Sequence, residues 1–327
     1  MPKPIYVMIT LDVEEEGLFT DAFPCKVTGV RNVSWLQGLA PLLARGVKPT
    51  LFCAHTVFAD RSAWPVLENL RDHHDAEIGA HLHFWNTPPI PPGPDVLYAV
   101  PACELDQGLL AAKLESVFKA GRDFQGRDLK VFRMGRWDLH KKHWPLLFEA
   151  GVEADASVRP LYEMKTPQEG ANHFAAPNQP YWIEHGGRRM FEAPLTVAPL
   201  SRLAANLHML PQNALGKKAR AFMRHWNTMA LLPAYHPLWS MKLTSRLCLQ
   251  RGNVLVMNWH SSEMMPGGAP HIPDAAAVEG LVARVGAWID WLRKHWDVRF
   301  VTLPELAALW KEKNLKPVPT GPGDWRP

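Results

Sequence analysis

The sequence predicts an α/β fold in which parallel strands form a barrel, and two observations carry this prediction. Runs of apolar, β-prone residues alternate along the chain with segments that have apolar residues at helical spacing. Polar residues that suit catalysis follow the end of one strand after another, which is where α/β barrels build their active sites. The 327 residues are enough for one such domain with a large core.

The first strand is expected over residues 5–12, because this run is apolar on both faces, as in a parallel sheet covered on two sides. Further strands are expected at 49–54, 77–81, 130–133, 151–158, 189–196, 253–260 and 298–302. Helices are expected at about 32–44, 64–73, 106–121, 138–150, 274–295 and from 304 onward. Residues 160–189 are expected to be irregular. Because a helix follows each strand, the sheet should be parallel.

The composition favours a soluble globular protein, with 47% hydrophobic and 21% charged residues. No stretch approaches the roughly 20 apolar residues that span a bilayer. The first residues lack the basic, apolar and small-residue regions of a signal peptide. The cysteines are scattered, with no Cys-x-x-Cys pair: Cys25, Cys53, Cys103 and Cys248. We therefore expect a cytoplasmic protein.

One region differs from the rest in charge. From Ala193 to Ser262 the chain has no Asp or Glu but eight Lys or Arg residues, whereas the whole chain has a net charge of only +4. Two interpretations remain open: a helical excursion with a solvated basic face, or a surface that docks to an anionic membrane or a substrate phosphate. The predicted membrane contact covers residues 201–251, and the protein would then be membrane-associated. Nucleic acid is not expected, because no nucleic-acid-binding motif accompanies the basic residues.

The end of the third strand delivers His81 and His83. Alternate side chains of a strand share a face, so both imidazoles could meet one metal ion, and Asp12 and Glu14 share a face at the end of the first strand in the same way. An isolated His-x-His is more often a pair of hydrogen-bonding or solvated residues, and acids at a strand end are more often solvated. Their joint occurrence at successive strand ends favours a metal-dependent site.

Taken in chain order, these strand-end residues resemble the short motifs of the polysaccharide deacetylase superfamily (NodB homology, carbohydrate esterase family 4) over roughly residues 5–310. The set consists of Asp12, Glu14, His81, His83, Arg133, Arg136 and His260. The runs GAHLHFWNTPP, FRMGRWDL, DASVRP and WHSSEMMPG are similar to those of one bacterial branch. The resemblance implies a distorted (β/α)7 barrel over residues 1–313. A basic helical insertion at about 197–252 precedes the last barrel strand, and residues 314–327 form an irregular tail.

The resemblance also implies roles for single residues. Asp12 becomes the general base, Arg133 orients it, and His260 becomes the general acid; Arg136 is a further expected catalytic residue. In most members the metal-binding acid follows the base directly, but Val13 stands there, so Glu14 is the inferred ligand. The second motif usually reads His-Thr-x-x-His.

His81 matches the first histidine of that motif, and Trp85 stands in place of the second, which leaves His83 as the substitute. The usual Pro-Tyr after the arginine is replaced by Gly135-Arg136-Trp137. The expected substrate-binding residues are Trp85, Asn86, Trp137, Asp155, Ser157 and Glu263.

The implied reaction is metal-dependent hydrolysis of the amide of an N-acyl amino sugar, free or on a phosphate or lipid carrier. Zinc suits two histidines and one carboxylate, while cobalt, nickel and iron remain open by ligand type. A non-catalytic carbohydrate-binding relative is one alternative, because the second motif is altered. A barrel glycoside hydrolase that uses Asp12 and Glu263 is another, and it would leave the histidines without roles.

Overall fold

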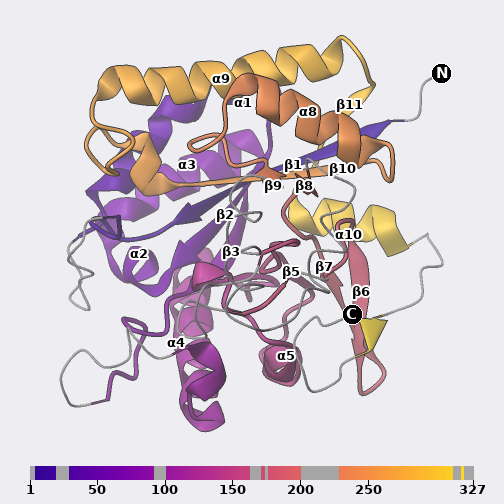
Figure 1. The fold of residues 1–327 in the computed structure, drawn as a ribbon. Coiled ribbons are helices and arrows are strands. Elements are labelled where there is room, and N and C mark those ends of the chain that lie inside the picture. The colour runs from indigo at the N-terminus through magenta and orange to yellow at the C-terminus, as the bar shows by residue number, and fades with distance from the viewer. Residues whose placement is uncertain are drawn as a thin grey trace, which may run out of the picture.

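The computed structural model describes residues 4–19, 29–91, 101–162, 171–173, 176–199, 228–311 and 318–319. A curled sheet forms the centre, and helices cover its outer face (Figure 1). The order of strands across the sheet is β10 (Val254–His260), β1 (Ile5–Val13), β2 (Pro49–Ala54), β3 (Glu77–Leu82), β4 (Val131–Met134), β5 (Ala154–Asp155), β7 (Arg188–Glu192), β6 (Tyr181–His185) and β12 (Val318–Pro319). A further strand, β11 (Val298–Phe300), pairs with the start of β1.

Within the described residues, the α-helices are α1 (Ala40–Leu43), α2 (His55–Ala59), α3 (Trp64–His74), α4 (Gln107–Gln125), α5 (Trp144–Glu149), α8 (Leu238–Leu249), α9 (Ala275–Arg293) and α10 (Leu303–Lys311). Short 3-10 helices are η1 (Arg31–Leu39), η2 (Arg61–Ala63), η4 (Ala102–Glu104), η5 (Gly135–Trp137), η6 (Lys141–His143) and η8 (Ser261–Met264). Helices α1, α8 and α9 lie together above the sheet in Figure 1. Of the described helices, α4 and α9 are the longest, and they begin where the side chains of Asp106 and Asp274 accept backbone N–H groups.

The two faces of β1 show how the sheet positions the site. Ile9 and Leu11 belong to the core under the outer helices, whereas Met8 packs in a separate inner core that α10 completes. Because side chains alternate along a strand, Thr10 and Asp12 follow Met8 on the inner face. The inner face is thus apolar at the start of the strands and polar at their ends, so the polar residues meet at the carboxyl end of the barrel.

The strands β10 and β12 stand at the two edges of the sheet, and the segment after β7 reaches across to β10. The N–H of Ala193 donates to the carbonyl of Asp155 on β5, and the N–H of Thr196 donates to the carbonyl of Val256 on β10. Leu231 in turn bonds to both Thr196 and Asn258 through its backbone. The prediction of a distorted parallel barrel is therefore confirmed.

Two details of the predicted sheet are wrong. Residues 181–185, expected to be irregular, form β6, and this strand runs antiparallel to β7. Gly186 and Gly187 have φ of 55° and 74° and make the tight turn between them, so the pair is a hairpin rather than a strand–helix unit. The two glycines of the Glu-His-Gly-Gly-Arg run were the available signal for that hairpin.

The predicted insertion is described only in part. A small antiparallel pair of β8 (Val197–Pro199) and β9 (Thr228–Ala230) precedes α8, whereas residues 200–227 lie outside the described residues. Most of the predicted tail lies outside them as well, apart from β12, which pairs with β6. Among the described residues, no helix has the length and apolar character required to cross a membrane.

Candidate active site

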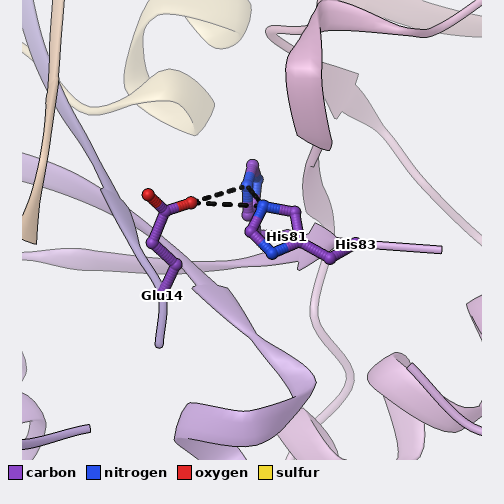
Figure 2. A group of neighbouring side chains, drawn as sticks. All are labelled: Glu14, His81 and His83. Atoms are coloured by element: carbon purple, nitrogen blue, oxygen red, sulfur yellow. Dashed lines mark hydrogen bonds and ion pairs between the residues drawn. The ribbon is translucent and has the colours of Figure 1, made fainter. Parts of the chain in front are cut away.

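Three side chains from the ends of β1 and β3, the two strands that flank β2, converge at the end of the barrel: Glu14, His81 and His83 (Figure 2). Glu14 Oε2 lies 3.5 Å from His81 Nε2 and 3.2 Å from His83 Nε2. The two Nε2 atoms are 3.0 Å apart. All three side chains are buried, at 4% exposure or less. The predicted convergence of His81 and His83 on Glu14 is therefore present in the structure.

The donor atoms of this cluster suit a metal ion. The Nδ1 of His81 lies 3.1 Å from the carbonyl oxygen of Arg133, and the Nδ1 of His83 lies 3.1 Å from Glu15 Oε1. Since both partners are acceptors, each Nδ1 must carry a proton, and in the neutral rings each Nε2 then directs a lone pair at the other and at Glu14. Ligands of a tetrahedral zinc ion at ~2.0–2.1 Å lie roughly 3.4 Å from one another, which is the spacing seen here. The cluster could therefore bind a metal ion.

Glu15 lies behind His83 and was not among the predicted site residues. Besides His83, its carboxylate accepts from Asn86 Nδ2 at Oε1 and from Thr56 Oγ1 at Oε2, the latter at 3.0 Å. Burial alone would raise the pKa of Glu15, but His83, a backbone hydrogen bond and the hydrogen bond from Thr56 lower it to about 2. Burial alone would lower the pKa of His83, yet Glu15 and Glu14 raise it to about 9.

The ring of His83 is fixed by its neighbours on both sides. Trp85 stacks on it with ring centroids 4.3 Å apart, and the guanidinium of Arg136 lies 4.3 Å from the Trp85 centroid. On another side the ring touches Gly135: a Cβ at that position would lie 2.4 Å from His83 Cδ2. The absence of a side chain at Gly135 therefore leaves room for the ring of His83.

The predicted base lies on the inner face of β1 and is held by Arg133 from β4. Arg133 Nη1 donates to Asp12 Oδ1 at 2.7 Å, and Asn258 Nδ2 donates to Asp12 Oδ2 at 3.2 Å. The same Nη1 also bonds to Thr10 Oγ1 and Asn258 Oδ1, at 3.0 and 2.6 Å. Burial alone would raise the pKa of Asp12, but the charge of Arg133, with help from His81 and His260, lowers it to about 2. Asp12 is therefore ionised.

The predicted acid, His260, ends β10 directly opposite Asp12 in the parallel register. Its Nε2 lies 3.8 Å from Asp12 Oδ2, and its Nδ1 lies 3.0 Å from Glu263 Oε2. The other oxygen of Glu263 lies 2.6 Å from His271 Nε2. Burial alone would lower the pKa of His260, but the carboxylates of Glu14, Glu263 and Asp12 raise it to about 10. His260 is therefore protonated at neutral pH.

The predicted substrate-binding residues lie near this centre, and most of them are engaged with protein atoms. Trp85, Asn86, Asp155, Ser157 and Glu263 are at most 3% exposed. Ser157 Oγ donates to Asp155 Oδ1 and accepts from the N–H of Met134. Trp137 is half-buried, with its ring 4.9 Å from the guanidinium carbon of Arg133. Contact of these six residues with substrate stays a prediction.

Asp155 also belongs to a buried pair that the sequence did not suggest. It pairs across the sheet with Glu192 of β7, and both side chains are fully buried. Burial, and for Glu192 the proximity of Asp155, raises the pKa of both carboxyls. Thr10 and Asn258, which bond to Arg133 beside Asp12, were also not predicted, although a signal for them exists. Alternate residues of a strand share a face, and Asn258 precedes His260 by two residues on β10, as Thr10 precedes Asp12 on β1.

Comparisons with known proteins support the fold. No family model matches the chain, and no curated protein sequence matches it. A protein from Mycobacterium smegmatis assigned as a polysaccharide deacetylase has a similar structure, with a TM-score of 0.56 and 17% identity, over 97% of this chain and 93% of that one. A Puue allantoinase is similar with a TM-score of 0.54 and 12% identity, over 95% of this chain and 91% of the other.

A third similar structure is a 4-alpha-glucanotransferase from Thermococcus litoralis. Its TM-score is 0.55 and its identity 12%, and the match covers 96% of this chain but only 41% of the enzyme. Proteins of different named activities thus share this barrel, so the fold does not identify the reaction. The chain has the barrel fold of the polysaccharide deacetylases, as its motifs predicted, and its Glu14–His81–His83 cluster could hold a metal ion.

Proposed function

We propose that the protein is a metal-dependent amidohydrolase that removes the N-acyl group, in the first instance N-acetyl, from an amino sugar or glycoconjugate. One observation carries the proposal: three converging ligand atoms of Glu14, His81 and His83 lie beside an ionised carboxylate and a protonated imidazole. Amide hydrolysis needs these parts, namely an activated water, a polarised carbonyl and a proton for the departing amine.

Each residue has a defined task in this proposal. A bound divalent ion, with zinc as the first choice, would polarise the acyl carbonyl and acidify a water molecule. Asp12 accepts a proton from the water while Arg133 holds its carboxylate in place. The water oxygen joins the acyl carbon, the C–N bond breaks, and His260 Nε2 gives its proton to the nitrogen. The products are a carboxylic acid and a free amine.

The test begins with metal analysis of protein purified without added metal, followed by measurement of acetate released from a panel of N-acetylated sugars. We expect about one metal ion per chain and activity that a chelator abolishes. Asp12→Asn should lower kcat by ~10²–10⁴-fold, the usual contribution of a general base, and should keep the metal. An Asp12→Asn protein with full activity would exclude this mechanism.

A non-catalytic carbohydrate-binding relative is the second candidate, because Trp85 occupies the place of the second motif histidine. It predicts sugar binding without metal and without acetate release. The glycoside hydrolase alternative draws on the fold shared with the glucanotransferase. It requires a free carboxylate at Glu263, whose two oxygens bond to His260 and His271. Glycosidic bond cleavage that resists chelation would support it.

We also propose that the basic region contacts an anionic lipid surface, where a lipid-linked substrate could be presented. Two of its aromatic residues, Tyr235 and Trp239, are 53% and 63% exposed, next to Lys242 and Arg246 of α8. Aromatic and basic residues together suit a membrane interface. Vesicles with phosphatidylserine should bind the protein in a salt-sensitive way, and vesicles of phosphatidylcholine alone should not.

Trp239→Ala should weaken this vesicle binding, whereas the control Trp35→Ala, a 46% exposed tryptophan on η1, should not. Deletion of residues 201–250 without any loss of binding would exclude the proposed surface. The expected cytoplasmic location stays a prediction.

A further inference from the structure

Glu15 is a buried carboxylate that the proposed reaction does not use, although it touches the metal cluster. Its side chain is fully buried, and its Oε1 lies 3.1 Å from His83 Nδ1. A buried carboxylate is costly unless it is paired and hydrogen-bonded, and Glu15 has three such partners in His83, Asn86 and Thr56. These partners come from the segments after β2 and β3, so the chain brings separate elements together to hold one carboxylate.

The position of Glu15 decides which nitrogen of His83 is free. A carboxylate can only accept at that distance, so Nδ1 carries a proton and Nε2 is left to face Glu14 and His81. For His81 the same selection is made by a backbone carbonyl, that of Arg133. Metal-binding histidines usually have such a partner, because it fixes the ring orientation and makes the ligating nitrogen more basic.

Glu15 acts together with two features of the same ring. Trp85 covers one face of the imidazole, and Gly135 lacks the Cβ that would collide with its edge. Trp85 stands where the motif has its second histidine, so it supports the ring of the histidine that takes over. Orientation, tautomer and space are thus all set for His83 by residues that are not themselves ligands.

We propose that Glu15 is a positioning residue that makes His83 a ligand of a divalent metal ion. The inference rests on the proposed metal-dependent function. It gives Glu15 the task of orienting His83, so that His81 and His83 can bind the same ion. Without the carboxylate, the neutral ring of His83 can rotate or can carry its proton on Nε2 instead of Nδ1, and Glu14 and His81 remain as a weaker two-ligand site.

The test compares the zinc affinities of metal-free proteins by competition with a chromogenic chelator. Glu15→Gln keeps the size of the side chain and removes its charge, and we expect it to weaken zinc binding by ~10–100-fold. Glu16→Gln is the matched control: it makes the same change at the next residue, whose carboxylate pairs at 2.8 Å with the exposed Arg31. Its zinc affinity should stay within about twofold of the wild type.

A second variant keeps the test valid if Glu15→Gln does not fold. Thr56→Val removes the donor to Glu15 Oε2 without touching His83, and we expect a smaller loss of zinc affinity. In the zinc-bound wild type, the Nδ1 proton of His83 should appear in a long-range nitrogen–proton NMR spectrum, shifted downfield by its bond to a carboxylate. That shift should decrease in Glu15→Gln.

Two results would overturn the inference. If Glu15→Gln binds zinc as tightly as Glu16→Gln while the wild type binds zinc and releases acetate, Glu15 has no positioning role and the proposed function stands. If the wild type binds no divalent metal, both fall together.

Discussion

Two glutamate–histidine pairs lie on the two sides of the site, and their geometry is almost the same. Glu15 Oε1 is 3.1 Å from His83 Nδ1, and Glu263 Oε2 is 3.0 Å from His260 Nδ1. Both glutamates are fully buried, and each has a second donor at its other oxygen, Thr56 in one pair and His271 in the other. In each pair the imidazole therefore directs its Nε2 toward the centre of the barrel.

The pairs differ in what that Nε2 meets. The Nε2 of His83 faces the Nε2 of His81 and the carboxylate of Glu14, in a position that is only 4% exposed. The Nε2 of His260 faces Asp12 at 3.8 Å, and its side chain is 20% exposed. The same carboxylate–imidazole pair thus suits two different tasks. Converging acceptor atoms around the Nε2 of His83 favour a cation, whereas the partly exposed imidazole of His260 favours proton transfer to a substrate.

The largest effect should come from removing each imidazole in turn. His83→Ala should lose both zinc binding, by at least ~100-fold, and activity, because one of three ligands is gone. His260→Ala should keep one zinc per chain and lose ~10²–10⁴-fold in kcat, because only the proton donor is missing. Metal analysis and steady-state kinetics on both proteins measure this difference.

Equal loss of zinc from the two alanine variants would contradict the division between a metal-binding His83 and a proton-donating His260. It would show that His260 belongs to the metal site. A matched control is His295→Ala, which removes an imidazole far from the site that bonds only to a helix carbonyl among the described residues. That protein should keep the zinc content and the activity of the wild type.

A smaller effect is expected from Glu263→Gln. Glu263 helps to raise the pKa of His260 to about 10, so its loss should lower that pKa. The acid then loses its proton at lower pH, and the alkaline limb of the kcat profile should move down by ~1–2 pH units, with zinc content unchanged. A profile identical to that of the wild type would show that Glu263 does not tune the acid.

The smallest effect concerns the stability of the metal-free protein. The folded-state pKa values of His83 and His260, about 9 and about 10, lie above the ordinary value of 6.5. Their contributions are therefore complete below pH 6.5 and are lost as the pH rises through the folded values, at up to ~1.4 kcal/mol per pH unit for each group.

Denaturant unfolding of the metal-free wild type between pH 6 and 10 measures this loss of free energy. His260→Gln and His83→Gln should each have a flatter pH dependence than the wild type. The difference curve for His83 should level off at lower pH than the curve for His260. An unfolding free energy that rises over this range would contradict both pKa shifts.

The acid–base half of the site was predictable from the sequence. Asp12 and His260 end strands that turned out to be neighbours in register, and Arg133 ends a strand on the same inner face. In a parallel sheet, strand ends and the period of two are enough to bring such residues together. Their tasks were inferred from the family resemblance, and they stay predictions.

For the proposed metal site, the sequence predicted the three converging side chains but not the residues around them. Glu15 was overlooked because the period of two places it on the opposite face from Glu14, and that rule fails where β1 ends at Val13. The hydrogen bonds that Thr56 and Asn86 give to it depend on how the segments after β2 and β3 pack, which no local pattern encodes. The substrate-binding residues were predicted because they lie next to the motif residues in the sequence. Most of their side chains are buried, so their contact with a substrate stays a prediction.

The contact between Gly135 and His83 constrains the order in which such a site could arise by mutation. A Cβ at position 135 would lie 2.4 Å from His83 Cδ2 and 2.8 Å from the carbonyl oxygen of Leu82, so any residue larger than glycine collides with the imidazole. A chain that acquired His83 first would have carried a clash, whereas a chain that acquired Gly135 first would only have gained space. The two positions are therefore coupled: glycine at 135 permits the observed orientation of His83, and a larger residue would displace the imidazole.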